Sequence, residues 1–176
     1  MTEPWTGAWQ WIDESFDGRL LLTEKHFCAV FGRRDRPTPQ GEQPTEAEAA
    51  ALFRSMSGPM AGRLTTTEIG GEWRHDTLLA VAAHPAQVGS RLRRAARVQN
   101  DLMFGELIGS DGTKKATHSF RKLSEPGAST LAGAWELVSD DWEGMMLMTD
   151  TQYRYVVTRK DRSQIAGPAA DLSDAD

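Results

Sequence analysis

Short apolar segments recur along the first 124 residues, and turn residues separate them at regular spacing. Residues 19–31 form two such segments around the polar turn Thr23–His26. Residues 62–83 predict a hairpin, because Gly70 and Gly71 supply the positive φ that a two-residue turn requires. Two more hairpins follow, which turn near residues 99–101 and 110–112. Such spacing is typical of an antiparallel sandwich or barrel.

One segment has helical periodicity instead. Thr45 is a candidate N-cap, and Glu48 completes a capping box three residues later. Apolar residues then recur at i, i+3, i+4 and i+7, and Gly58 stands where the helix is expected to end. The pattern predicts one amphipathic helix against the mouth or flank of the sheet.

The chain repeats its own opening. Residues 131–162 align with residues 5–36 without a gap, and ten positions are identical. The conserved pairs include Gly7 and Gly133, Trp9 and Trp135, and Gly18 and Gly144. Chance rarely preserves both glycines and the tryptophan over so short a stretch, so we interpret this as an internal repeat.

These patterns predict an all-β fold with one short helix. About eight strands lie within residues 1–124, enough to close a small antiparallel barrel. Residues 125–130 form a polar linker, and residues 131–176 hold three more strands of a partial second repeat with a polar tail. Two interpretations remain open. The chain belongs to a longer tandem protein, which we favour, or the extra strands cover the barrel or exchange into a homodimer through residues 131–162.

Composition narrows the class of protein. The net charge of −5 argues against a nucleic-acid partner, and the lone cysteine, Cys28, excludes an intrachain disulfide. No signal peptide or membrane-spanning apolar run is evident, so we expect a cytoplasmic protein without a membrane partner.

The order of several short motifs resembles the bacterial and fungal lipocalin-like domain family. Members often carry G-x-W on the first strand, a turn with Thr, R-x-D-R-P, and P-x-x-V-G before a strand with an arginine. The matching residues are Gly7, Trp9, Thr23, Arg33, Asp35, Arg36, Pro37, Pro85, Val88, Gly89 and Arg94. The resemblance covers residues 5–124 and restarts over 131–162, while Thr77 and Leu78 stand where members often have a histidine.

The resemblance implies a calycin-type barrel with a central pocket. The family includes carriers of small molecules and enzymes of secondary metabolism that cyclise or isomerise a hydrophobic substrate. We therefore expect a small hydrophobic ligand, with a cofactor-free cyclase or isomerase and a non-catalytic carrier or sensor as alternatives. In such a barrel the tryptophan of the first strand packs at the closed end.

Several aromatic side chains are candidates for the pocket wall. Trp11, Phe27 and Phe31 share the faces expected to point inward, and His75 follows Trp73 in parity. Each is also an ordinary core residue, because in a barrel the core face and the pocket wall are the same surface.

Arg94 is the most informative charge, because it shares the parity of the apolar residues on its strand. An inward arginine requires an ion-pair partner or an anionic ligand. A three-residue loop over 99–101 places Glu106 opposite Arg94 and turns Phe104 inward, whereas a two-residue turn places Glu106 in solvent. We favour the three-residue loop and a ligand-binding position for Phe104.

In that register His118 lies diagonally from Glu106, and the pair could shuttle a proton as catalytic residues. A satisfied polar core is the alternative. No histidines have metal-ligand spacing and no phosphate-binding glycine loop occurs, so we expect neither a metal nor a cofactor.

Overall fold

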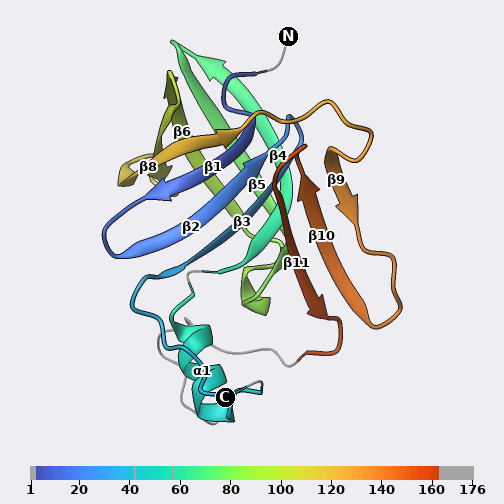
Figure 1. The fold of residues 1–176 in the computed structure, drawn as a ribbon. Helices are drawn as coiled ribbons and strands as arrows, with labels where there is room; N and C mark the ends of the chain where they lie inside the picture. Colours follow the sequence, from blue (N-terminus) through green and yellow to red (C-terminus); the bar gives the residue numbers. More distant parts are fainter. Residues whose placement is uncertain (1–2, 42, 57, 163–176) are drawn as a thin grey trace.

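Eight antiparallel strands close into a barrel in the computed structural model, which describes residues 3–41, 43–56 and 58–162 (Figure 1). Each strand pairs with the next along the chain, and the first pairs with the eighth, where Trp11 lies opposite Phe120. The strands are β1 (Gly7–Ile12), β2 (Phe16–Leu22), β3 (His26–Arg33), β4 (Met60–Ile69), β5 (Glu72–Ala82), β6 (Arg91–Gln99), β7 (Leu102–Ile108) and β8 (Lys114–Ser124). The predicted fold class is confirmed.

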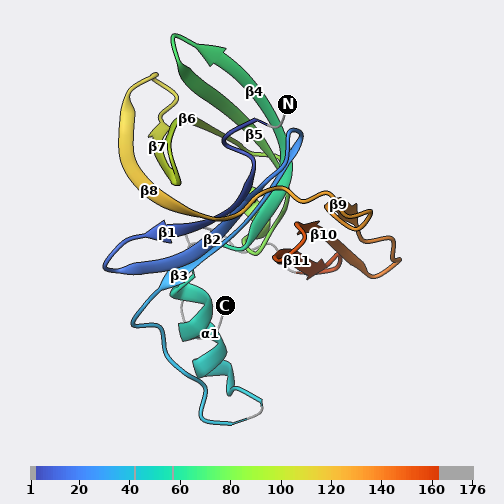
Figure 2. The same ribbon diagram turned by 45° about the horizontal axis from the view of Figure 1, so that its top comes forward.

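The helix α1 (Glu46–Arg54) begins as predicted. The Thr45 hydroxyl accepts a hydrogen bond from the Glu48 N–H, and the Glu48 carboxylate accepts one from the Thr45 N–H at 2.8 Å. The helix ends at Arg54, short of the predicted end near Gly58, because Met56 already bridges to Gly32 of β3. It lies beyond one end of the barrel, next to β2 and β3 (Figure 2). A 3-10 turn, η1 (Pro85–Gln87), joins β5 to β6.

Three further strands form a separate sheet in the order β11-β10-β9. They are β9 (Gly133–Glu136), β10 (Trp142–Met148) and β11 (Tyr153–Arg159). Leu147 and Val156 are buried against the outer surface of the barrel, where the side chains are mostly small: Ala8, Leu21, Cys28, Ala61 and Val81. The extra strands therefore cover one side of their own barrel, as Figures 1 and 2 show from two directions. The predicted polar tail lies outside the described residues.

The internal repeat is visible in the strand register. Trp9 lies opposite Leu20 in the barrel, and Trp135 lies opposite Met146 in the sheet. The Trp9 indole N–H donates to the Trp5 carbonyl at 2.9 Å, and the Trp135 indole N–H donates to the Leu131 carbonyl at 3.0 Å. β9–β11 therefore reproduce β1–β3 residue by residue.

The barrel interior is filled largely by side chains. Its buried cluster includes three tryptophans and runs from Trp5, ahead of β1, to Phe120 on β8. The described part of the chain therefore has two hydrophobic clusters. One fills the inside of the barrel, and the other lies between the barrel and the three-stranded sheet. Within the described residues, no helix has the length and apolar character needed to cross a membrane.

Candidate functional site

A cavity of about 30 Å³ lies inside the barrel. Its lining is mostly aliphatic and aromatic, with three polar side chains, and comprises Leu20, Leu22, Phe27, Leu64, His75, Thr77, Arg94, Ala96, Met103, Gly105 and Phe120. A single water molecule needs roughly 10–15 Å³ of free volume. The cavity therefore has room for about two water molecules or for one small polar group of a ligand.

Three polar side chains stand in one row across neighbouring strands, and two of them, His75 and Arg94, line this cavity. Thr66 on β4 lies opposite His75 on β5, and His75 lies opposite Arg94 on β6. Thr66 shares the inward face of Leu64, two residues earlier on the same strand. We call Thr66, His75 and Arg94 the polar row.

Two members of the polar row have a buried atom without a partner among the described residues. The Thr66 hydroxyl and the Nε2 of His75 are buried without a hydrogen-bond partner in the described part of the chain. The Trp5 indole nitrogen is also buried without a hydrogen-bond partner among the described residues. The Trp5 ring meets the His75 ring edge-on at 4.8 Å. Buried polar groups are normally hydrogen-bonded, so three unpartnered atoms at and next to one cavity call for an explanation, and a bound ligand is one.

Arg94 supplies the positive charge of the row. Its side chain is partly buried, and loss of hydration lowers the pKa of its guanidinium. The ordinary pKa of arginine is so high that the group remains a cation. Among the described residues no carboxylate pairs with it, which leaves a desolvated positive charge beside an apolar cavity.

His75 is neutral at physiological pH. Burial, and then the charge of Arg94, lower the pKa of His75 to about 4. A neutral imidazole has one donor and one acceptor nitrogen, so His75 can either donate to or accept from a ligand, depending on its tautomer.

Aromatic side chains form a second part of the interior around Trp11. The Trp11 ring stacks on Phe16 at 5.3 Å and meets Phe31 edge-on at 4.9 Å. It also meets the His118 ring at 4.7 Å and lies close to Phe120, which lines the cavity as well. Phe120 therefore connects the aromatic cluster to the cavity.

His118 is half-buried beside this cluster, near the exposed end of β8. Burial and the charge of Arg94 lower the pKa of His118, while Asp13 acts in the opposite direction. The site thus contains two histidines with lowered pKa values and one arginine that has no carboxylate partner within the part of the chain that the structure describes.

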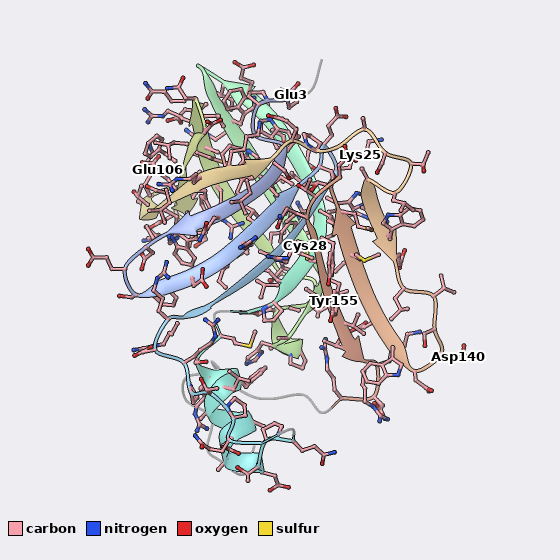
Figure 3. All side chains as sticks on the ribbon, in the orientation of Figure 1. Glu3, Lys25, Cys28, Glu106, Asp140 and Tyr155 are labelled. Carbon is pink, nitrogen blue, oxygen red and sulfur yellow. The ribbon has the colours of Figure 1, made fainter. Side chains whose placement is uncertain are left out.

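The predicted pairing of Arg94 with Glu106 is wrong. Arg94 lies opposite Leu107, and Glu106 lies opposite Ala95. The turn contains only two residues, and Asn100 adopts a φ of 54° that such a turn requires. This shift of one residue directs Glu106 outward, where it pairs with Lys114 on the side of the barrel away from the three-stranded sheet (Figure 3).

The inward position predicted for Phe104 is wrong for the same reason, and its side chain is 39% exposed. Met103 and Gly105 line the cavity in its place. The proton shuttle between Glu106 and His118 therefore has no geometric basis, because the two side chains lie on opposite faces of the wall.

The other predicted residues divide into two groups. Phe27, His75 and Arg94 line the cavity, whereas Trp11, Phe31 and Trp73 belong to the surrounding core. The sequence pattern did not point to Trp5 or Thr66, and it placed Met103 inward only in the two-residue turn, the alternative that we did not favour. The parity of Leu64 would have pointed to Thr66, and the Asn-Asp dipeptide at 100–101 favours the two-residue turn that brings Met103 inward.

Cys28 lies outside this site. Cys28 lies on β3, and burial against the three-stranded sheet raises the pKa of its thiol to about 12, which disfavours the reactive thiolate (Figure 3). The described residues contain no cluster of three or more histidine, cysteine, aspartate or glutamate side chains that could hold a metal ion.

Comparison with known proteins supports the fold. No family model matches the chain, and no curated protein matches it. The crystal structure of an uncharacterized protein from Saccharomyces cerevisiae is similar, with a TM-score of 0.55 and 9% identity over 88% of this chain and 74% of that one. At that identity the similarity shows the architecture alone, which is consistent with a calycin-like barrel. Membership of the lipocalin-like family stays a prediction.

Proposed function

We propose that the barrel binds a small, mainly apolar molecule that carries an anionic group, and that this group pairs with Arg94. The observation that carries the proposal is the Arg94 guanidinium, which pairs with no carboxylate among residues 3–41, 43–56 and 58–162. It stands in a row with polar atoms of Thr66 and His75 that likewise have no partner in those residues. An isolated buried charge is costly, and an anionic ligand removes that cost.

The geometry suits a carboxylate or a similar planar anion. A guanidinium donates two parallel hydrogen bonds to a carboxylate, and the Thr66 hydroxyl can donate a third. The neighbouring histidine is neutral near pH 7 because its pKa is lowered, so the positive charge that attracts the anion resides on Arg94.

The size of the cavity limits how the ligand enters. About 30 Å³ admits the headgroup and not an extended apolar body. The body of the ligand therefore has to displace flexible lining side chains such as Met103, or lie along the aromatic cluster around Trp11.

Carriage or sensing is the role that we favour. The catalytic pair expected from the sequence does not form, because Glu106 faces solvent. Isomerisation or cyclisation is the second candidate, and it rests on His118, a histidine with a lowered pKa at the edge of the aromatic cluster.

Calorimetric titration with straight-chain carboxylates from acetate to decanoate tests the proposal. Wild-type protein is expected to bind at least one member saturably, and the alcohol of equal length more weakly. Arg94→Met should weaken carboxylate binding at least tenfold. Arg97→Met is the matched control, because Arg97 lies on the same strand, faces outward and pairs with Glu72. Equal affinity of both variants, or no binding by the wild type across the series, would overturn the proposal.

A further inference from the structure

The outer face of the three-stranded sheet is rich in exposed aromatic side chains. Trp135, Trp142, Tyr153 and Tyr155 are 43–57% exposed, and Leu137 and Val157 are each 41% exposed. All belong to the face opposite Leu147 and Val156, which contact the barrel. We call these six residues the aromatic face.

The repeat shows what kind of surface this is. Trp135 corresponds to Trp9, which is fully buried, and Tyr153 corresponds to Phe27, which is 1% exposed. Val157 corresponds to Phe31 in the same way, and the strand registers are identical. The aromatic face is therefore a copy of the inner wall of the barrel, turned toward solvent.

The edges of this sheet are also open. In the barrel, the outer edge of β1 pairs with β8 and that of β3 pairs with β4. The corresponding edges of β9 and β11 have no strand partner in the described part of the chain. Exposed edges of this kind are usually blocked by charges, and these two edge strands carry Glu136, Arg154 and Arg159. Of the three, Arg159 alone occupies an outward position, so the aromatic positions themselves carry no charge.

We propose that the aromatic face docks on the same face of a second copy of this chain. A two-fold axis perpendicular to the strands makes β9 meet its own counterpart antiparallel, and it does the same for β11. Both apolar faces and all four free edges are then covered at once.

The composition and size of the face fit such an interface. Tyrosine, tryptophan, methionine and arginine are the residues enriched at protein interfaces, and Met146 and Met148 lie on the same side of β10. At about half exposure, four aromatic side chains of roughly 150–250 Å² supply on the order of 400 Å². The aliphatic residues and the two edges add to this, toward the ~800 Å² per partner of a stable dimer.

Sedimentation equilibrium of the full chain over roughly 1–100 µM tests the proposal. We expect a dimer for the wild type and a monomer for Tyr155→Glu and for Val157→Glu, each with an unchanged circular dichroism spectrum. Two control variants place the same charge on exposed apolar residues elsewhere: Phe104→Glu on β7 and Ile69→Glu at the end of β4. Both should remain dimeric.

Three results would overturn the proposal. The wild type could stay monomeric over the whole range, which would exclude a second copy as the occupant. The dimer could persist in both face variants, as it would if whole strands were exchanged. Finally, the control variants could dissociate the dimer as completely as the face variants. None of these results bears on ligand binding inside the barrel.

Discussion

His75 on β5 lies directly opposite Arg94 on β6, and the positive charge of Arg94 opposes protonation of the imidazole. Because burial acts in the same direction, His75 is held neutral in the folded protein, with a pKa of about 4 against an ordinary value of 6.5. The pair makes the interior of the barrel sensitive to acid.

We therefore expect stability to fall as the pH drops from 6.5 toward 4. The unfolded chain takes up a proton on His75 in this range and the folded chain does not, so the stability present above pH 6.5 is progressively lost. The shift corresponds to about 3 kcal/mol. Urea denaturation of wild type and His75→Gln at several pH values measures it, and the variant should show a shallower slope. Parallel slopes would contradict the assignment to His75.

Replacing Arg94 should stabilise the ligand-free protein. Arg94→Met removes a partly buried charge that has no carboxylate partner in the described chain. Apolar replacements of buried ionic groups are neutral or stabilise by about 1–4 kcal/mol, and we expect a gain toward the lower end. Arg97→Met should change stability by less than about 1 kcal/mol, because the Arg97 side chain is 61% exposed and Glu72 keeps its ion pairs with Arg74 and Lys114. Chemical denaturation without ligand measures both. A loss of about 3 kcal/mol or more in Arg94→Met would indicate a partner for the guanidinium.

Gly105 offers a way to fill the cavity without disturbing the fold. A Cβ at this position would meet Phe120 at 3.5 Å, an ordinary van der Waals contact. Gly105→Ala should therefore leave stability within about 1 kcal/mol and weaken carboxylate binding. Gly18→Ala is the contrasting variant, because a Cβ there would lie 2.2 Å from the Phe31 ring. Gly18→Ala should therefore unfold at a lower denaturant concentration than the wild type. If Gly105→Ala bound carboxylates with unchanged affinity, the ligand would have to lie outside this cavity.

Glu106→Gln tests the register of β6 and β7. Its carboxylate pairs with Lys114 outside the barrel, so the substitution should cost less than about 1 kcal/mol and leave carboxylate binding unchanged. His118→Gln, by contrast, alters the aromatic cluster next to the cavity. If Glu106→Gln abolished binding or any turnover while His118→Gln did not, Glu106 would have to reach the interior.

The sequence predicted where the helix and strands lie along the chain better than it predicted the register in which the strands pair. Capping residues and glycine turns are local, so Thr45 and Gly70-Gly71 mark their elements correctly. The pairing of β6 with β7 depends on a single residue in the turn, and that residue decides whether Phe104 or Met103 faces inward. Thr66 was missed because it lies in a run of three threonines, where no apolar alternation marks the inner face.

The docking of the second sheet could not be predicted from its strands alone. The barrel presents small outer residues, Ala8, Cys28 and Ala61, to Leu147 and Val156. That fit depends on the curvature of the two sheet surfaces. The alternation of apolar and polar residues shows only which side chains share one face of a strand. For the candidate site, parity placed Arg94 and His75 correctly, while the volume of the cavity followed from the packing of all eight strands.

The segments β1–β3 and β9–β11 share one sequence pattern, although only one of them can occupy the first three positions of the barrel. This duplication affects how faithfully the chain folds. Until β4 and β8 find their partners, β9–β11 can compete with β1–β3 for the same edges, a failure typical of repeat proteins. Tyr155 opposes that error, since its counterpart, Ala29, is completely enclosed and leaves no room for a phenol ring. The divergence of the two copies thus lets each segment fold in its own place.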